Sequence, residues 1–191
     1  CRRLTYRFAD LVTVNLSTNI SSLERFVPKA NILFLPNPIS LPQSIANPSH
    51  RHRTILSVGR LHEQKAFDTL IRAYAKSRSH RNGWKLKIVG EGPAKEQLAT
   101  LAREHGLDPA QTLMPATRNL WETHSRSSVF VLASRYEGLP NALLEALAHG
   151  LVPIVSKGVG DLAFDLEALY PNFVFDIDDE KKLVENLDWL T

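Results

Sequence analysis

Residues 134–150 read SRYEGLPNALLEALAHG, and this stretch decides how the rest of the chain is interpreted. It follows an apolar run typical of a buried strand, and its spacing predicts a helix that begins near Pro140. Gly138 permits an unusual backbone angle in the turn, and the first turn of the helix offers free N–H groups to an anion. Glu137 lies in the turn and Glu145 inside the helix. Together these features fit a nucleotide sugar, with phosphates facing the N–H groups and sugar hydroxyls facing the carboxylates.

The same helix has a simpler interpretation. Its polar residues Asn141, Glu145 and His149 are spaced four apart, with Ala and Leu elsewhere. This is also the exposed stripe of a mostly buried helix. The stretch alone leaves both interpretations open, so the rest of the chain has to decide between them.

Residues 54–191 alternate between strand and helix patterns. Strands are expected at residues 54–58, 84–89, 113–114, 129–133, 151–155 and 173–175, and helices at 67–75, around 98–102, after Pro140, and at the end of the chain behind Asp178 or Asp179. Strands separated by helices predict an α/β domain with a parallel, doubly wound sheet. In such a sheet, ligands bind outside the carboxyl ends of the strands.

Glycine and charged residues follow four of these strand ends. The turns hold Gly59-Arg60 with Lys65, Gly90-Glu91-Gly92-Pro93, Glu137-Gly138, and Ser156-Lys157-Gly158-Val159-Gly160. A single glycine turn is weak evidence, but four on one rim with two cations predict a shared, phosphate-bearing ligand.

The composition is that of a soluble globular protein, with 43% hydrophobic and 23% charged residues. No apolar run approaches the roughly 20 residues of a membrane helix. Cys1 is the only cysteine, so disulfides are excluded and a reducing cytoplasm is expected.

Charge is unevenly distributed along the chain. Residues 1–81 hold 13 Lys/Arg against 4 Asp/Glu, whereas residues 82–191 hold 10 against 16. A basic half fits a phosphorylated ligand, a nucleic acid or an anionic membrane surface. No nucleic-acid motif is present, so we expect no nucleic-acid partner. Arg2, Arg3 and Arg7 leave peripheral association with the inner face of a membrane open.

Three parts are expected along the chain. Residues 1–39 read as the tail of a truncated N-terminal domain, with strands at 11–14 and 32–35 and a helix capped by Ser17 or Thr18. Residues 40–53, rich in Pro, Ser, Asn, His and Arg, read as an interdomain linker. Residues 54–191 form the third part, and we expect the whole to be a piece of a longer polypeptide.

Three segments in the order VGRLHEQKAFDTLIRA, KLKIVGEGP and SRYEGLPNALLEALAHG resemble the C-terminal half of family-four retaining glycosyltransferases, which have the GT-B fold. The match covers residues 54–160, and its most specific part is the pair Glu137 and Glu145 with seven residues between them. The resemblance implies that residues 54–191 are a Rossmann-like, donor-binding domain, truncated at its C-terminal end. It also implies that residues 2–38 end the acceptor-side domain.

The resemblance implies roles for individual residues. The donor-binding residues would be Gly59, Arg60, Lys65, Glu137, Gly138, Leu139 and Glu145. Arg60 and Lys65 would hold the diphosphate and stabilise the departing nucleotide, so with Glu137, which faces the donor sugar, they would be the catalytic residues. Glu145 would accept hydrogen bonds from the ribose, and the N–H groups near Gly138 and Leu139 would contact the diphosphate.

Three positions depart from the family pattern. Lys65-Ala66 stands where Lys-Gly is usual, which we expect to tighten that loop. Met114-Pro115-Ala116 stands where a glycine is common, which leaves the contacts to the nucleotide base undefined. A Gly-Gly followed by Glu is represented only by Gly158-Val159-Gly160-Asp161.

No metal or cofactor is expected. His62, His124 and His149 are interpreted as surface residues or as core residues with satisfied hydrogen bonds. Asp176-Ile177-Asp178 superficially matches the metal-binding Asp-x-Asp of another glycosyltransferase fold, but its place before a helix favours capping. Metal independence and retention of configuration are implied by the resemblance alone.

The sequence therefore predicts a retaining, hexosyltransferase-like glycosyltransferase that transfers a sugar from a nucleotide-activated donor to a carbohydrate or lipid-linked acceptor in polysaccharide biosynthesis. Residues 1–191 are expected to bind nucleotide but to transfer no sugar by themselves. The base (UDP, GDP or ADP), the sugar and the acceptor are not revealed.

Rival functions fit less well. A sugar-nucleotide epimerase needs further acid/base residues, and a glycosyl phosphorylase needs a pyridoxal-binding lysine. A non-catalytic domain that binds a phosphorylated ligand or a partner protein would not need all of Arg60, Lys65, Glu137 and Glu145. A dinucleotide-dependent dehydrogenase fits worst, since residues 90–93 lack the third glycine of its fingerprint.

Overall fold

The computed structural model describes residues 6–15, 20–28, 31–35, 37–39, 41–42, 45–117 and 119–191. The chain divides into two compact units, Cys1–Ile39 and Ser40–Thr191. The expected Ser17 and Thr18 caps, Arg2, Arg3 and the Arg7 side chain lie outside the described part of the chain.

The first unit contains a small parallel sheet. Its elements are η1 (Tyr6–Phe8), β1 (Val12–Val14), α2 (Ile20–Leu23) and β2 (Ile32–Phe34). Strands β1 and β2 pair in parallel, with Val12 opposite Ile32 and Val14 opposite Phe34. The two strands expected here are therefore confirmed, and Val12, Val14 and Val27 are buried.

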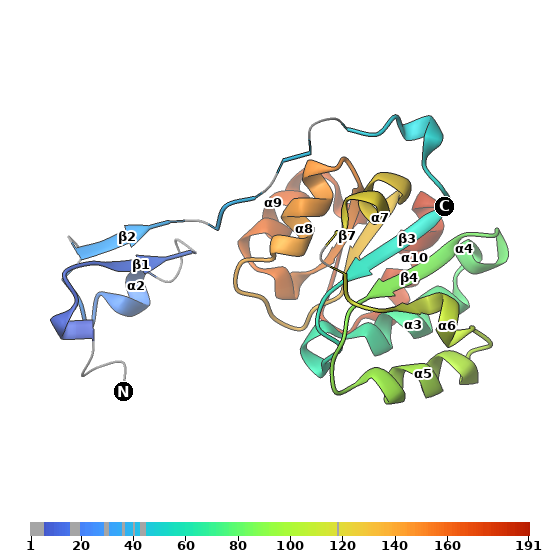
Figure 1. The fold of residues 1–191 in the computed structure, drawn as a ribbon, viewed down its shortest axis with the longest axis horizontal. Coiled ribbons are helices and arrows are strands. Elements are labelled where there is room, and N and C mark those ends of the chain that lie inside the picture. Colours follow the sequence, from blue (N-terminus) through green and yellow to red (C-terminus); the bar gives the residue numbers. More distant parts are fainter. Residues whose placement is uncertain are drawn as a thin grey trace. The chain divides into compact units, whose positions relative to one another are not determined.

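The second unit is built on a parallel sheet in the order β5-β4-β3-β6-β7-β8. Figure 1 labels β3, β4 and β7 of this sheet. The strands are β3 (Thr54–Val58), β4 (Lys85–Val89), β5 (Leu113–Met114), β6 (Val129–Leu132), β7 (Val152–Ser156) and β8 (Val174–Phe175). The six strands and their parallel pairing confirm the predicted α/β fold class.

Helices separate the strands. They are α3 (Phe67–Lys76), α4 (Arg78–Arg81), α5 (Lys95–Glu104), α6 (Pro109–Thr112), α7 (Trp121–Arg126), α8 (Asn141–Ala148), α9 (Asp161–Leu169) and α10 (Glu180–Leu190), with short 3-10 turns η4 (Pro48–His50), η5 (Glu63–Lys65), η6 (Lys157–Val159) and η7 (Pro171–Phe173). Among the described residues of the expected linker, η4 is the only helical turn. None of the described helices is long and apolar enough to span a bilayer.

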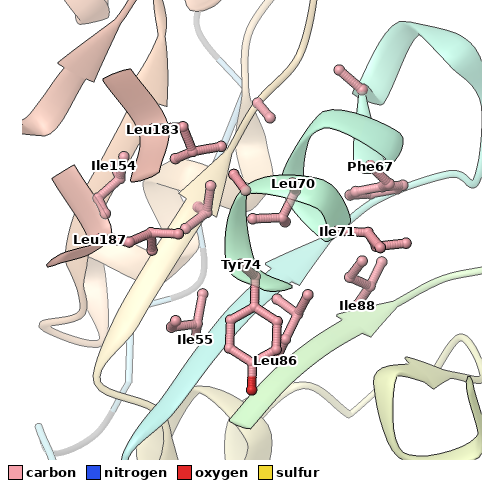
Figure 2. Packing of buried hydrophobic residues seen from close by; sticks show 14 of the residues in the cluster. Ile55, Phe67, Leu70, Ile71, Tyr74, Leu86, Ile88, Ile154, Leu183 and Leu187 are labelled. Carbon is pink, nitrogen blue, oxygen red and sulfur yellow. The ribbon is translucent and has the colours of Figure 1, made fainter. Parts of the chain in front are cut away.

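Both faces of the sheet are buried by helices. Consecutive residues of a strand point to opposite faces, so they join different cores. In β6, Val129 and Val131 join one core, and Phe130 and Leu132 join the other. The first core is closed by α3, α5 and α10, and Figure 2 shows Leu70 of α3 and Leu183 of α10 within it. The second is closed by α8 and α9. Burial on two sides explains why the strands are apolar runs rather than alternating ones.

The strand order creates a switch point beside β3. From β3 the chain proceeds through β4 to β5 on one side, and it then returns to β6 on the other side of β3. The turns after β3 and β6 leave the sheet in diverging directions, and the crevice between them is where doubly wound sheets bind ligands. Lys65 follows β3 and Glu137 follows β6, so the topology brings them to this crevice.

The start of α10 shows which of two neighbouring aspartates caps the helix. Asp179 caps this helix, and its side chain accepts a hydrogen bond from the Lys182 N–H at 2.9 Å. Asp178 instead has a left-handed backbone angle, φ 59°, and accepts hydrogen bonds from Thr69 and Arg135. The prediction that Asp178 or Asp179 caps this helix is therefore confirmed, and the residue that does so is Asp179.

Candidate functional site

The four turns at the carboxyl edge form one continuous rim, because backbone hydrogen bonds join them. The Leu61 N–H donates to the Glu91 carbonyl at 2.9 Å, which links the turns after β3 and β4. The Arg135 N–H donates to the Gln64 carbonyl at 2.8 Å and the Glu137 N–H to the Gly158 carbonyl at 2.9 Å, which links β3, β6 and β7. The predicted gathering of these turns on one rim is confirmed.

Lys65 and Glu137 form an ion pair at the switch point. Lys65 Nζ lies 2.6 Å from Glu137 Oε1, and the two side chains are 17% and 7% exposed. Ser134 Oγ, which is buried, also donates to Glu137 Oε1 at 2.6 Å. A carboxylate at this depth requires such partners, since burial of an unpaired charge is costly. One of the three ammonium donors of Lys65 is used here, which leaves two for a ligand.

Arg135 holds the turn that carries Lys65 against the turn that carries Glu137. Its guanidinium donates to the Glu63 carbonyl and, through Nε, to Asp178 Oδ2 at 2.9 Å. The hydrogen bond from Arg135 holds the pKa of the Asp178 carboxyl below its ordinary value. Gln64 Nε2 adds a hydrogen bond to the Tyr136 carbonyl at 2.9 Å. The sequence analysis assigned no role to Ser134 or Arg135, although both lie in residues 134–150.

Three glycines of the rim have a packing role that the sequence analysis missed. A Cβ on Gly90 would lie 1.9 Å from the Gly59 carbonyl oxygen, and one on Gly92 would lie 2.3 Å from that of Leu61. A Cβ on Gly158 would lie 2.2 Å from the Ser134 oxygen. These glycines are required where one backbone crosses another closely, so their presence is not by itself a sign of phosphate.

Gly138 behaves differently from the expectation. The glycines with positive φ are Gly83, Gly106, Gly150 and Gly160, so the turn does not use the positive φ that Gly138 permits. No atom lies within 4 Å of a Cβ built on Gly138. Within the described chain the N–H groups of Gly138 and Leu139 make no hydrogen bond. They lie just before α8, whose N-cap is Pro140, and are free to face an anion.

Ala66, which stands where the family pattern has glycine, keeps a backbone conformation that suits glycine. It adopts a left-handed conformation, φ 47° and ψ 39°, and is fully buried between η5 and α3. A non-glycine residue there carries strain of about 1 kcal/mol. The loop geometry that suits glycine is therefore retained around alanine.

Arg60 and Glu145 line two different cavities. Arg60 is exposed and lines a cavity of about 250 Å³ together with Gly59, Glu91 and Thr117. No hydrogen bond or ion pair holds its guanidinium within the described residues. Leu120 lies between this cavity and the next, because it lines both.

Glu145 lines a cavity of about 340 Å³ with Leu41, Trp121 and two histidines. The structure thus brings Lys65 and Glu137 together in one pair, but it places Glu145 in a neighbouring hollow on α8. No group of three or more His, Cys, Asp or Glu suited to a metal exists among the described residues.

The two histidines beside Glu145 stack on each other. The rings of His124 on α7 and His149 after α8 lie 4.8 Å apart with an angle of 24° between their planes. His149 Nδ1 is 2.8 Å from the Glu145 carbonyl, but Nε2 of both rings is buried without a partner among the described residues. The expectation of satisfied core histidines is therefore wrong for these two nitrogen atoms. His62, in contrast, is exposed and accepts a hydrogen bond from the Gln64 N–H at 3.3 Å.

Arg51, from the expected linker, closes this cluster. Its guanidinium donates to the Ser127 carbonyl at 2.9 Å and to the His149 carbonyl, so it bridges the C-terminal ends of α7 and α8. A cation is favourable at both helix ends. No sequence signal indicated this contact, because the partners lie 76 and 98 residues away.

We expect His124 to make the fold sensitive to acid. Burial, and then the nearby His149, lowers the pKa of His124 to about 4, against about 6.5 in an unfolded chain. The unfolded state therefore binds a proton first as pH falls, and stability is lost between about pH 6.5 and pH 4. The loss should be on the order of 2 kcal/mol, measured as urea unfolding at about pH 7 and pH 4.5.

The substitution His124→Phe should remove most of that pH dependence, whereas the control His105→Gln should retain it. An equal loss of stability in wild type and His124→Phe would show that His124 is not the group responsible.

Comparison with known proteins identifies a family that this chain matches over most of its length. The family model described as glycosyl transferases group 1 matches residues 43–191. An uncharacterized glycosyltransferase of Haemophilus influenzae is 34% identical over 164 residues, which cover 84% of this chain and 45% of that protein. A Campylobacter jejuni N-acetylgalactosamine-N,N'-diacetylbacillosaminyl-diphospho-undecaprenol 4-alpha-N-acetylgalactosaminyltransferase is 30% identical over 195 residues, or 96% of this chain and 51% of that protein.

A solved structure shares the fold. The pneumococcal O-GlcNAc transferase GtfA, in complex with UDP and GlcNAc, superposes with a TM-score of 0.81 at 17% identity, over 99% of this chain and 40% of that chain. The chain spans about half the length, or less, of each of these proteins.

Proposed function

This chain belongs to the group 1 glycosyl transferases, and we propose that residues 40–191 bind the nucleotide-activated sugar donor of such an enzyme. The observation that carries the proposal is the Lys65–Glu137 pair at the switch point. Two further groups have no partner among the described residues and lie on the same rim: the guanidinium of Arg60 and the N–H groups of Gly138 and Leu139. A diphosphate would receive positive charge from Lys65 and Arg60, and backbone hydrogen bonds from Gly138 and Leu139.

Lys65 would act on both halves of the donor. Its contact with Glu137 leaves two N–H donors free, so the ammonium can bridge the carboxylate and a phosphate oxygen. Positive charge held at this position stabilises the negative charge that develops on the departing nucleotide. Glu137 would accept hydrogen bonds from the sugar, while its own position is held by Ser134 and Lys65.

Glu145 would bind the ribose from the adjoining cavity. Its carboxylate lies on α8, five residues into the helix, and the hollow that it lines adjoins that of Arg60 at Leu120. A nucleotide would extend across these two hollows, with its diphosphate towards Lys65. Gly59, at the end of β3, would let the backbone approach the ligand.

The acceptor is proposed to be a carbohydrate or a lipid-linked saccharide. The printed name of the Campylobacter jejuni relative describes a saccharide on diphospho-undecaprenol. We extend this class of acceptor to the present chain, together with a cytoplasmic location, peripheral at the inner face of the membrane, in polysaccharide biosynthesis. Transfer with retention of configuration, without a metal or other cofactor, is part of the proposal and rests on the family resemblance.

Calorimetric titration with UDP, GDP and ADP, each paired with its nucleoside, tests the donor site. One diphosphate should bind best, and Arg60→Ala and Lys65→Ala should each weaken it by about 1.5–3 kcal/mol, the range for a charged hydrogen bond. Binding of the matching nucleoside should change little, because neither residue touches it.

Arg103→Ala, an exposed arginine of α5, is the control and should bind like wild type. Equal losses for the nucleoside and its diphosphate would show that Arg60 and Lys65 do not recognise phosphate, and the proposal would fail.

A further inference from the structure

A third cavity lies at the opposite end of the strands from the donor site. Its volume is about 590 Å³, larger than the hollows beside Arg60 and Glu145. Most of its lining residues precede β3, β4 and β5 or stand in the first half of β3 and β4, so it lies towards the amino ends of these strands. Met114, at the end of the short β5, also lines it. Figure 1 shows α4 at the end from which the β4 arrow starts. This volume is within the range of small-molecule sites.

The lining is strongly basic. Arg53, Lys85 and Lys87 line the cavity, together with His52 and His80, and the only carboxylate among its lining residues is Asp108. Asp108 is already engaged, because its Oδ1 accepts from the Ala110 N–H at 2.9 Å as the cap of α6. Neither lysine forms an ion pair within the described chain. Arg53 comes from the basic first half of the sequence, whereas Lys85 and Lys87 come from the acidic second half, so the tertiary structure is what gathers these cations around one cavity.

Lysines on a strand can also serve to prevent edge-to-edge pairing. Strand β5 pairs only with Ile88 and Val89 of β4, so the segment from Lys85 to Lys87 has no strand on that side. This segment is nevertheless covered. Helix α6 contacts β4, and the Tyr74 hydroxyl donates to the Trp84 carbonyl at 2.6 Å. This cover protects part of the edge, and the gathering of both lysines with Arg53 around one cavity is a separate feature to explain.

The base of the cavity is apolar. Leu86 and Leu107 are 3% and 7% exposed, and both line it. Leu86 belongs to the core that α3, α5 and α10 close, whereas Lys85 and Lys87 alternate with it along β4 and lie on the other face, so the cavity extends around the open edge of this strand. A hollow with an apolar floor and basic side chains along its rim suits a compact ligand that joins an anionic group to a less polar body. A flat membrane surface or a nucleic-acid backbone would contact exposed cations without entering a hollow.

We propose that this cavity binds a small phosphate-bearing molecule, with Lys85, Lys87 and Arg53 as the residues that receive the phosphate. The site is separate from the donor site, because the two stand at opposite ends of the same parallel strands. It would give the protein a second anionic ligand besides the nucleotide sugar.

The test uses inorganic pyrophosphate and the isotope-labelled chain, observed by amide NMR. Pyrophosphate should shift the amides of Gly83, Gly106 and Leu107, which line the cavity. In the double variant Lys85→Ala/Lys87→Ala, the apparent affinity for pyrophosphate, obtained from these shifts, should fall at least tenfold. The control Lys181→Ala/Lys182→Ala, on α10, should leave them unchanged, and melting temperatures verify that each variant is folded.

The amides of Gly59 and Gly138 report the donor site separately, so failure at one site is distinguishable from failure at the other. Absence of shifts at the cavity amides, or equal shifts in Lys85→Ala/Lys87→Ala, would overturn the proposal. Vesicles containing phosphatidylglycerol form the second arm. If they bind wild type but not this variant, while pyrophosphate leaves the cavity amides unmoved, the basic residues serve a lipid surface and the proposal is wrong.

Discussion

Replacing Glu137 with glutamine is expected to lower sugar transfer by the full-length enzyme by about 100-fold or more while free nucleoside diphosphate binds almost as before. The substitution preserves the shape of a side chain that is 7% exposed, but it removes the charge that Lys65 and Ser134 contact. Its proposed hydrogen bonds are made to the reacting sugar, so the effect should fall on turnover rather than on nucleotide affinity.

Glu145→Gln is the matched comparison. This carboxylate lies in the neighbouring hollow on α8, where the ribose is proposed to bind, so its loss should weaken free nucleotide and whole donor alike. Steady-state kinetics, calorimetry and melting temperatures of both variants separate the roles. If Glu137→Gln abolishes nucleotide binding and Glu145→Gln does nothing, the assignment is reversed. A silent Glu145→Gln with a small change in stability would favour a merely exposed helix stripe.

Gly90→Ala should destabilise the fold by about 3 kcal/mol, a large effect for one methyl group. The added Cβ would lie 1.9 Å from the Gly59 carbonyl oxygen, and backbone on both sides of the contact is held by the sheet. The Gly59 N–H donates to the Val89 carbonyl at 3.1 Å, so neither turn can withdraw without losing hydrogen bonds. Urea unfolding of the purified chain measures the loss.

Gly138→Ala is the control for that measurement. It has no neighbour within 4 Å of the added Cβ and no positive φ, so its stability should change by less than about 0.5 kcal/mol. A stable Gly90→Ala variant that loses only nucleotide binding would show that Gly90 serves the ligand rather than the packing of the rim.

Much of the fold follows from local patterns. Strand β3 and the helix after it were predicted with nearly their observed bounds, because apolar runs and helical spacing are properties of neighbouring residues. The parallel sheet follows from the alternation of these elements, and it brings the turns after β3 and β6 to one edge. Short helices such as α7, whose N-cap makes no side-chain hydrogen bond, left no such signal.

The roles of the candidate residues were implied by the family resemblance, and they stay predictions until the donor is bound. The sequence by itself determined the sheet, the rim and the candidates Arg60, Lys65, Glu137 and Glu145, since each depends on short-range spacing. Only the tertiary structure decided that Lys65 pairs with Glu137 across 72 residues and that the backbone at Gly59 passes too close to Gly90 for a side chain there. It also decided that His124 stacks on His149, and that Lys85 and Lys87 share a hollow with Arg53. The physical reason is that these contacts join distant segments, whose approach is set by the packing of both cores and leaves no pattern between neighbouring residues.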